Sequence, residues 1–361
     1  MIDTSDNTLS ELTRELDALG TQYDRTGDWP QKSVDLIAGA GAWKWNLPAA
    51  YGGDPVCHKD LLRVYAALSA GCMSTALIST QRDGAVELLA GCDNDALKSR
   101  WLPSLARGEV YTTVGISQLT TSKRGGGRTL MTATPDGDGY RLDGMMPWAT
   151  GAEQAAVVVT GAVLPDGRQI LAAVPTDRPG LRVDQPDELF VLTCSRTSCV
   201  HCDNYRVEPD ELIRGPADKV LSLRTPVKPL VTSACGIGVA TALHDVVVNL
   251  PEAARRPFDD VVQPLLDHYR AVRESLLSAA DGLDDPAFEA PSTRIRVQVN
   301  ALLVRLAMTT LTLAKGSAFL TCRPVQRHVR EAMFFLVWSA TGQTQLETLA
   351  RLMAPLPVDS K

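Results

Sequence analysis

Leucines recur at three- and four-residue steps near the start of the chain, and these are Leu9, Leu12, Leu16 and Leu19. The spacing puts them on one face and predicts a helix over residues 7–22. The same apolar spacing predicts further helices over residues 31–42, 60–68, 74–89 and 95–105. A proline and two glycines in residues 48–53 predict a loop. Residues 1–109 are therefore predicted to form an all-α N-terminal domain.

The pattern changes after residue 109 to short segments that are β-branched or alternate between apolar and polar residues. These segments are residues 130–133, 140–142, 155–163, 170–174, 181–183 and 200–207. Turn-forming proline, aspartate and glycine separate them at residues 135–139, 165–167 and 178–180. Turns this closely spaced predict an antiparallel sheet. Residues 110–222 are therefore predicted to form a middle β-domain, either a barrel or a sandwich.

Helical periodicity returns after Pro226. It predicts helices over residues 227–249, 258–280, 292–312, 325–338 and 343–353. Gly236 and Gly238 in the first of these allow a close approach of a neighbouring helix. Residues 223–361 are therefore predicted to form a C-terminal helical bundle. The fold class is α+β, with a helical domain on each side of the β-domain.

The charge of the chain excludes several classes of partner. The 361 residues have a net charge of -6 and a pI of about 5.5, whereas a nucleic-acid-binding protein needs a basic domain or stripe. We see no long uncharged apolar run of the kind a membrane helix needs. The acidic first 16 residues lack the basic and apolar regions of a secretory signal. We therefore expect a cytoplasmic protein without nucleic acid or membrane partners.

The eight cysteines are scattered, as expected for small buried side chains in a reducing compartment. Only Cys199 and Cys202 have a spacing typical of metal ligands, and no second pair of ligands accompanies them. On a strand, their odd separation places the two thiols on opposite faces. No metal site is therefore predicted.

Short segments along nearly the whole chain resemble the motifs of one family, in the same order and at similar spacing. The segments are residues 47–53, 90–109, 139–150, 206–209, 255–258 and 319–332. Among them, Trp148-Ala-Thr150 is similar to the W-I-T motif of the acyl-CoA dehydrogenases. Arg327, Arg330 and Glu331 fall in register with its R-x-x-R-D motif. The chain thus resembles the acyl-CoA dehydrogenase superfamily, which implies that family's α-β-α fold.

The resemblance implies FAD, bound between the β-domain and the bundle. Trp148 would offer its flat apolar face to the flavin, and Thr150 would donate a hydrogen bond to a ring nitrogen. Arg255 would pair with the pyrophosphate, a role that Arg256 could also fill. The alternative is a buried tryptophan, an ordinary strand threonine and solvated loop arginines.

Further residues match the family's cofactor-binding motifs only in part. Thr341 and Gln343 match a T-x-Q motif that helps to hold the flavin. Ser117 opens the stretch that replaces the family's E-P-G-A-G-S-D turn, and residues 125–127 form either an anion-binding nest or a surface hairpin. Gly316 is the one glycine retained of three near the nucleotide.

The chain departs from the family at the catalytic base. The family's reaction removes a proton beside a thioester carbonyl, which requires a carboxylate. Counting from Arg330 places that carboxylate at Ser339, and the other position used in the family falls on Lys228. Neither side chain is a base of the required kind. Glu331 and Glu347 are nearby in sequence but not at an expected base position.

Three functions remain open on these residues. The first is an FAD-dependent oxidoreductase that desaturates an acyl thioester carried by coenzyme A or a carrier protein. The second is a flavin-dependent monooxygenase or oxidase of the same superfamily, and the third is a paralogue without redox activity. The resemblance also implies a homodimer or homotetramer whose flavin contacts cross between subunits.

Overall fold

The computed structural model describes residues 4–120, 129–221, 225–285 and 287–354. Its N-terminal helices are α1 (Asp6–Thr26), α2 (Gln31–Gly39), α3 (His58–Gly71), α4 (Met73–Ala90) and α5 (Asp95–Arg107). The Ser5 hydroxyl caps α1 by accepting from the Thr8 N–H, and Gly27 ends it at a φ of 69°. Glycine adopts this left-handed angle without steric cost. The five predicted helices are confirmed, with ends that differ by a few residues.

The middle of the chain forms one mixed sheet. Its strands are β1 (Tyr111–Gly115), β2 (Met131–Asp136), β3 (Gly139–Ala149), β4 (Ala155–Val163), β5 (Gln169–Pro175), β6 (Leu181–Val183), β7 (Ser198–Val207) and β8 (Leu212–Ala217). The order is β6-β7-β3-β2-β4-β5-β8, and β1 pairs with β4. The neighbours are antiparallel, except that β1 and one residue of β2 run parallel to β4. The sequence predicted the antiparallel strands but not β1 and β8.

The C-terminal part is helical, as predicted. It contains α7 (Lys228–Val248), α8 (Glu252–Arg255), α9 (Asp259–Asp281), α10 (Ser292–Ala314), α11 (Pro324–Phe334) and α12 (Gly342–Met353). The two predicted close approaches on α7 are present. A Cβ added to Gly238 would lie 2.0 Å from Ser69 Oγ on α3, and one added to Gly236 would lie 2.4 Å from Val299 Cγ1 on α10. Only glycine therefore allows α7 to pack this closely on both sides.

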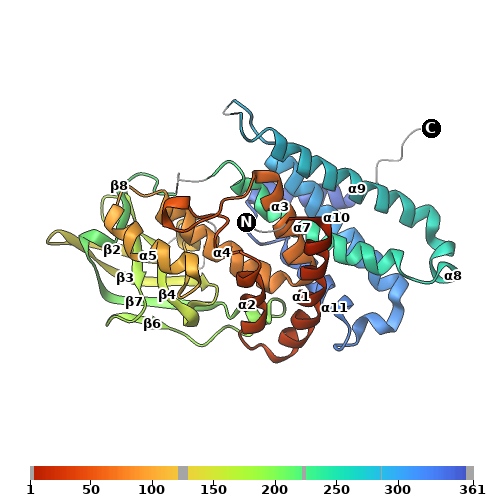
Figure 1. Cartoon of the computed structure of the whole chain (residues 1–361), viewed down its shortest axis with the longest axis horizontal. Helices are drawn as coiled ribbons and strands as arrows, with labels where there is room; N and C mark the ends of the chain where they lie inside the picture. Colours follow the sequence, from red (N-terminus) through yellow and green to blue (C-terminus); the bar gives the residue numbers. More distant parts are fainter. Residues whose placement is uncertain (1–3, 121–128, 222–224, 286, 355–361) are drawn as a thin grey trace.

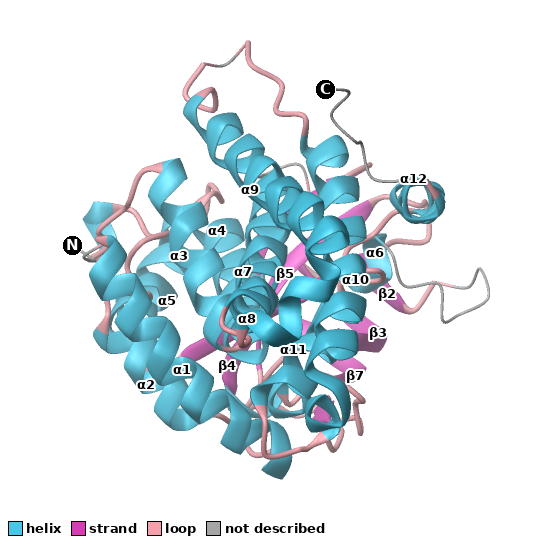
Figure 2. Cartoon of the chain, turned by 90° about the vertical axis from the view of Figure 1, so that its right-hand side faces the viewer, coloured by secondary structure: helices cyan, strands magenta, loops and turns pink. Residues whose placement is uncertain are grey.

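The N-terminal and C-terminal helices share one apolar core, because α3 and α10 both pack against α7. The strands lie at one end of the molecule, the N-terminal helices lie beside them, and α8 lies at the far end (Figure 1). Seen from that end, the C-terminal helices stand in front of the sheet, with α12 set to one side (Figure 2). Any contact between the sheet and α8 would therefore need a second copy of the chain.

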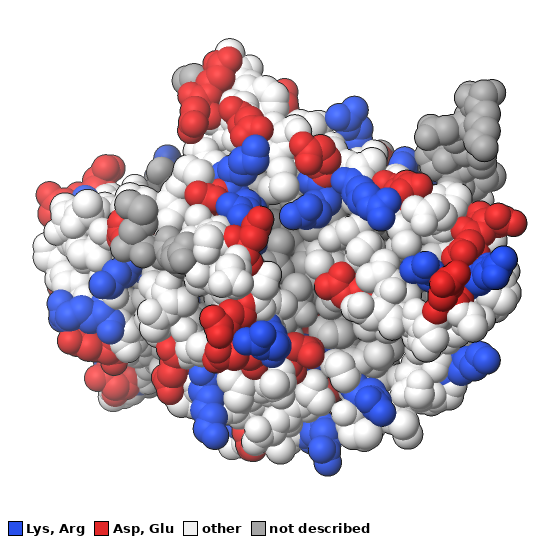
Figure 3. All heavy atoms as spheres, turned by 45° about the vertical axis from the view of Figure 1, so that its right-hand side comes forward, with Lys and Arg blue, Asp and Glu red and all other residues white. Residues whose placement is uncertain are grey.

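Two helical stretches are long and apolar enough, by length and composition alone, to cross a membrane. They are α7 and residues Ser292–Phe319, but 61% and 56% of their most apolar windows are buried inside the protein. Burial of this kind is typical of core helices. On the face in Figure 3, the described Lys and Arg side chains are interspersed with Asp and Glu, so this face offers no continuous basic surface.

Candidate functional site

Trp148 lies near the end of β3. A β-bulge between Met146 and Ala149 interrupts the pairing of β3 with β7. The side chains of Met146 and Ala149 are buried, whereas Trp148 is 37% exposed. The bulge thus turns the indole out of the β-core, which leaves a flat apolar surface for a planar ligand.

Thr150 lies just beyond β3 and is buried, with a relative exposure of 4%. Its hydroxyl is 3.1 Å from the Thr197 hydroxyl, which is 2.9 Å from the Ser195 hydroxyl. Three hydroxyl groups carry three protons, and these two hydrogen bonds use only two of them. One proton remains for an acceptor outside this chain of hydroxyls.

Ser117 begins α6 (Ser117–Thr120), a short helical turn that follows β1 and packs against β3 and β4. Gln118 fixes the turn, because its Nε2 donates to Gly115 O at 2.8 Å and to Gly161 O at 3.0 Å. The Ser117 Oγ is buried and has no hydrogen-bond partner among the described residues. A buried hydroxyl without a partner costs free energy, so its position fits a ligand with a polar edge.

Two of the predicted site residues, Arg255 and Gly316, lie in the C-terminal part of the chain. Arg255 ends α8 and pairs with Asp259, with 3.4 Å between Nε and Oδ1. Gly316 lies in the 3₁₀ turn Lys315–Phe319, and a Cβ added there would meet nothing within 4 Å. Because α8 lies at the opposite end of the molecule from the strands, one chain does not bring Arg255 to Trp148 (Figure 1).

Thr341 and Gln343 have local partners at the start of α12. The Thr341 hydroxyl caps this helix by accepting from the Thr344 N–H at 3.2 Å. The Gln343 side chain donates to Glu347 Oε1 at 2.5 Å. Both residues are exposed, so their side chains are accessible to a cofactor or a second subunit.

Ser339 is exposed in the connection between α11 and α12. Its φ of 51° is a left-handed value that is uncommon for a residue other than glycine. Lys228, at the second base position, starts α7 and lies 3.6 Å from Glu87 Oε2. The side chain of Lys228 is thus held in an ion pair with a carboxylate. The structure therefore supplies no base at Lys228.

Glu331 belongs to a buried ion-pair network, which argues against its use as a replacement base. Its carboxylate accepts from Arg327 Nη1 at 3.1 Å and from the Met73 N–H at 3.2 Å, and lies 3.0 Å from His328 Nδ1. Arg327 also pairs with Asp17 of α1. Burial alone would raise the pKa of Glu331, but the neighbouring Arg327 and His328 lower it to about 2. The network therefore joins α1, α4 and α11 and holds no readily available base.

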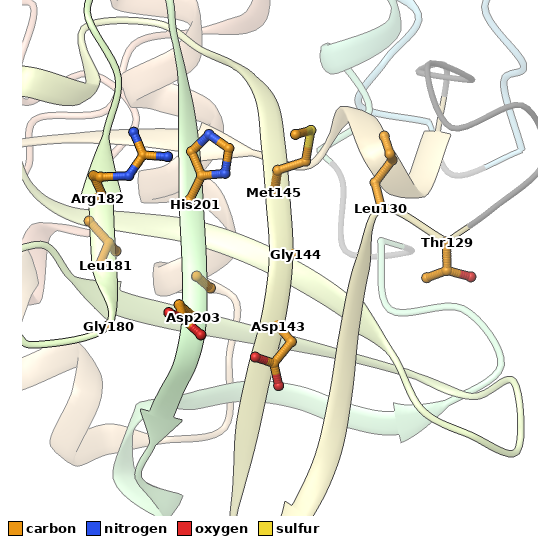
Figure 4. Close-up of a pocket in the computed structure, with 11 residues that line it drawn as sticks. Thr129, Leu130, Asp143, Gly144, Met145, Gly180, Leu181, Arg182, His201 and Asp203 are labelled. Atoms are coloured by element: carbon orange, nitrogen blue, oxygen red, sulfur yellow. The ribbon is translucent and has the colours of Figure 1, made fainter.

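Two cavities among the described residues stand apart from the predicted site residues. The first, of about 930 Å³, lies on the outer face of the sheet and is lined by residues of β3, β6 and β7 (Figure 4). Met145, His201 and Arg182 stand there side by side on adjacent strands. The second, of about 750 Å³, lies among α1, α3, α7 and α9. The first cavity could not be predicted from the sequence, because its lining depends on how β3, β6 and β7 pair.

The structure adds two neighbours to the cysteine pair that the sequence singled out. Cys202 is buried and Cys199 is half-buried, so the two thiols face opposite sides of β7, as their spacing predicts. The outer thiol, however, has ligand-type neighbours in Asp184 and His201. His201 was visible two residues from Cys199, but Asp184 comes from the neighbouring strand and gave no local signal.

Comparisons with known proteins agree with this architecture. A family model for the acyl-CoA dehydrogenase N-terminal domain matches residues 6–109. The probable acyl-CoA dehydrogenase YngJ of Bacillus subtilis is 23% identical, over 94% of this chain and 93% of the relative. The cyclohex-1-ene-1-carbonyl-CoA dehydrogenase of Geobacter metallireducens is 25% identical, over 95% of each protein.

Two solved structures show the same fold. A glutaryl-coenzyme A dehydrogenase in complex with glutaryl-CoA superposes with a TM-score of 0.82 at 18% identity, over 98% of this chain and 95% of the other. The dibenzothiophene monooxygenase TdsC from Paenibacillus sp. A11-2 superposes with a TM-score of 0.77 at 17% identity, over 97% of both chains. The chain is thus similar to acyl-CoA dehydrogenases along almost its whole length, and the family model matches its N-terminal residues 6–109.

Proposed function

We propose that this protein is a flavin-dependent oxidoreductase of the acyl-CoA dehydrogenase type, which acts on an acyl thioester and lacks the usual catalytic carboxylate. The observation that carries the proposal is the match to acyl-CoA dehydrogenases along almost the entire chain. The carrier of the acyl group would be coenzyme A or a carrier protein.

The residues around β3 support the flavin. Trp148 offers a half-exposed apolar face, Thr150 belongs to a hydroxyl chain with one spare proton, and the buried Ser117 Oγ lacks a partner among the described residues. Together these residues can stack on one face of a tricyclic ring and donate hydrogen bonds to its polar edge. FAD is the expected cofactor, and the FMN-bound structure of TdsC makes FMN the alternative to test.

When bound, the flavin would supply the hydride acceptor for desaturation of the thioester. The protein must remove the accompanying proton from the carbon beside the carbonyl. Ser339 cannot accept that proton at neutral pH without a base of its own. Lys228 and Glu331 do not replace it, because each is held in an ion pair. We therefore expect slow desaturation.

The second candidate is a flavin-dependent monooxygenase or oxidase. The missing carboxylate favours this function, since neither Ser339 nor Lys228 is a carboxylate. Oxygen chemistry at a reduced flavin needs no base beside a thioester. The fold it would require is present, because the dibenzothiophene monooxygenase superposes over 97% of the chain. A paralogue without redox activity is the third candidate.

An anaerobic titration distinguishes the three functions. Freshly purified protein with the visible absorption of oxidised flavin excludes the third. Slow bleaching of that absorption by a saturated acyl-CoA supports the dehydrogenase. Bleaching only by an external reductant, followed by oxygen consumption in air, supports the monooxygenase or oxidase instead.

A further inference from the structure

Three side chains that can ligate a metal ion meet on the outer face of β6 and β7. Cys199 and His201 are two residues apart on β7 and therefore point to the same side. Asp184 follows β6, and its N–H donates to the Cys199 carbonyl at 2.9 Å, which fixes it opposite the thiol. One donor atom of each residue lies within 4.8 Å of the other two.

The carboxylate of Asp184 is already divided between two partners. Its Oδ2 lies 2.8 Å from His201 Nε2, and its Oδ1 pairs with Arg182. These two contacts fix the orientation of the Asp184 carboxylate. A cation that replaces the proton between His201 and Asp184 would leave Arg182 free to orient the second oxygen, as outer partners of metal ligands do.

We propose that Asp184, Cys199 and His201 bind one divalent ion of the Zn²⁺ type. A thiolate, an imidazole and a carboxylate together match the ligand preference of zinc. Zinc bonds of about 2.0–2.3 Å in a tetrahedron place neighbouring ligand atoms roughly 3.3–3.8 Å apart. The three donors, which lie within 4.8 Å of one another, must therefore close by about 1.5 Å at most, while the His201–Asp184 contact opens. Cys199 loses its proton on binding.

The surroundings leave room for a fourth ligand. His201 also lines the cavity of about 930 Å³, with Met145 and Arg182 beside it (Figure 4). Cys199 is half-buried, and its sulfur lies 4.0 Å from Met145 Sδ. Three protein ligands with an open fourth position would let water, or an anion from the cavity, complete the coordination. The proposal needs no flavin and is independent of the reaction.

Calorimetric titration of the metal-stripped full chain with Zn²⁺ tests the site. We expect one ion per chain, and we expect Cys199→Ser and His201→Ala each to weaken binding by more than about tenfold. The matched control is Cys322→Ser, an exposed cysteine in the C-terminal part. Absence of stoichiometric binding, or equal affinity in the wild type and the two ligand variants, would overturn the proposal.

A second measurement needs no variant. Iodoacetamide labelling followed by mass spectrometry reports the reactivity of each thiol, because only a free thiolate is alkylated rapidly. Zn²⁺ should slow the labelling of Cys199 severalfold and leave Cys322 unchanged. Equal labelling of Cys199 with and without Zn²⁺ would contradict the proposal, even if the variants fail to fold.

Discussion

Ser339 is the residue on which the proposed chemistry depends. A carboxylate at this position should restore the proton acceptor, and general-base catalysis contributes about 10²–10⁴-fold. We therefore expect Ser339→Glu to increase the rate at which a saturated acyl-CoA reduces the flavin, by a factor of up to about 10²–10⁴. Anaerobic stopped-flow absorbance measures this rate directly.

The control for this substitution is Ser339→Gln, which has the same size and the same backbone constraint at a φ of 51° but no base. Rapid reduction of the wild type that survives Ser339→Ala would contradict the account, because another base would then be acting. Equal gains in the Glu and Gln variants would also contradict it.

Glu331 should contribute to stability rather than to catalysis. Removing one partner of a buried ion pair costs about 3–5 kcal/mol, because the other charge stays buried without compensation. We expect Glu331→Gln to lower the free energy of unfolding in urea by a value in this range. Glu347→Gln, on the more accessible surface of α12, should have little effect. A Glu331 variant as stable as the wild type would show that the network does not join the helices.

The lowered pKa of Glu331 predicts that the stability of the protein depends on pH. The pKa of Glu331 is lowered from 4.5 to about 2 in the folded protein. Its contribution to stability is therefore fully present above pH 4.5 and is lost as the pH falls towards 2. Unfolding curves should show a smaller loss of stability for Glu331→Gln than for the wild type across this interval. An identical acid response in both proteins would contradict the assignment.

At the scale of elements, local signals were sufficient for the helices and for most strands. Leucine spacing located α1, and a run of small and β-branched apolar residues located β4 with the bounds Ala155–Val163. Strand β8 was not predicted because Gly215 and Pro216 interrupt its pattern. Its place is set by pairing with β5, which no local signal encodes.

The same reasoning explains which site residues could be found. Trp148 and Ser339 are predicted from motif spacing, which only requires counting along the chain. Asp184 and His201 were not linked, because their contact depends on the register of β6 and β7. The buried partners of Glu331 had a partial signal, since Arg327 and His328 lie at helical spacing from it.

The contact between α7 and α3 should tolerate no side chain at Gly238. An added Cβ would lie 2.1 Å from the Ala66 carbonyl oxygen, which is backbone and cannot rotate away. We expect Gly238→Ala to lower the free energy of unfolding by about 1–3 kcal/mol. Gly39→Ala at the end of α2 is the control, because nothing lies within 4 Å of its added Cβ. Equal stability of the two variants would contradict this packing.

At the scale of the whole molecule, the proposed flavin site is incomplete within one chain. Trp148 and Arg255 lie on elements at opposite ends, so a second copy is needed to bring the two together (Figure 1). The C-terminal part also exposes large apolar side chains, including Val337, Leu346 and Met353. Such exposure is typical of a surface that another protein covers.

We therefore expect a homodimer or a homotetramer. Light scattering at micromolar concentration should give a mass of at least twice 38.9 kDa. Leu346→Asp should shift the protein towards a smaller species, whereas Glu11→Gln, a charge change on the exposed surface of α1, should not. A wild-type mass equal to that of one chain would contradict a flavin site shared between two copies.

The central claim is that the protein binds flavin, and the visible absorption spectrum of freshly purified protein tests it most directly. The account predicts the two bands of oxidised flavin, with close to one flavin per chain after incubation with FAD. Trp148→Ala should reduce this occupancy, because the stacking surface is lost. A colourless wild-type protein that takes up neither FAD nor FMN would contradict the proposed function.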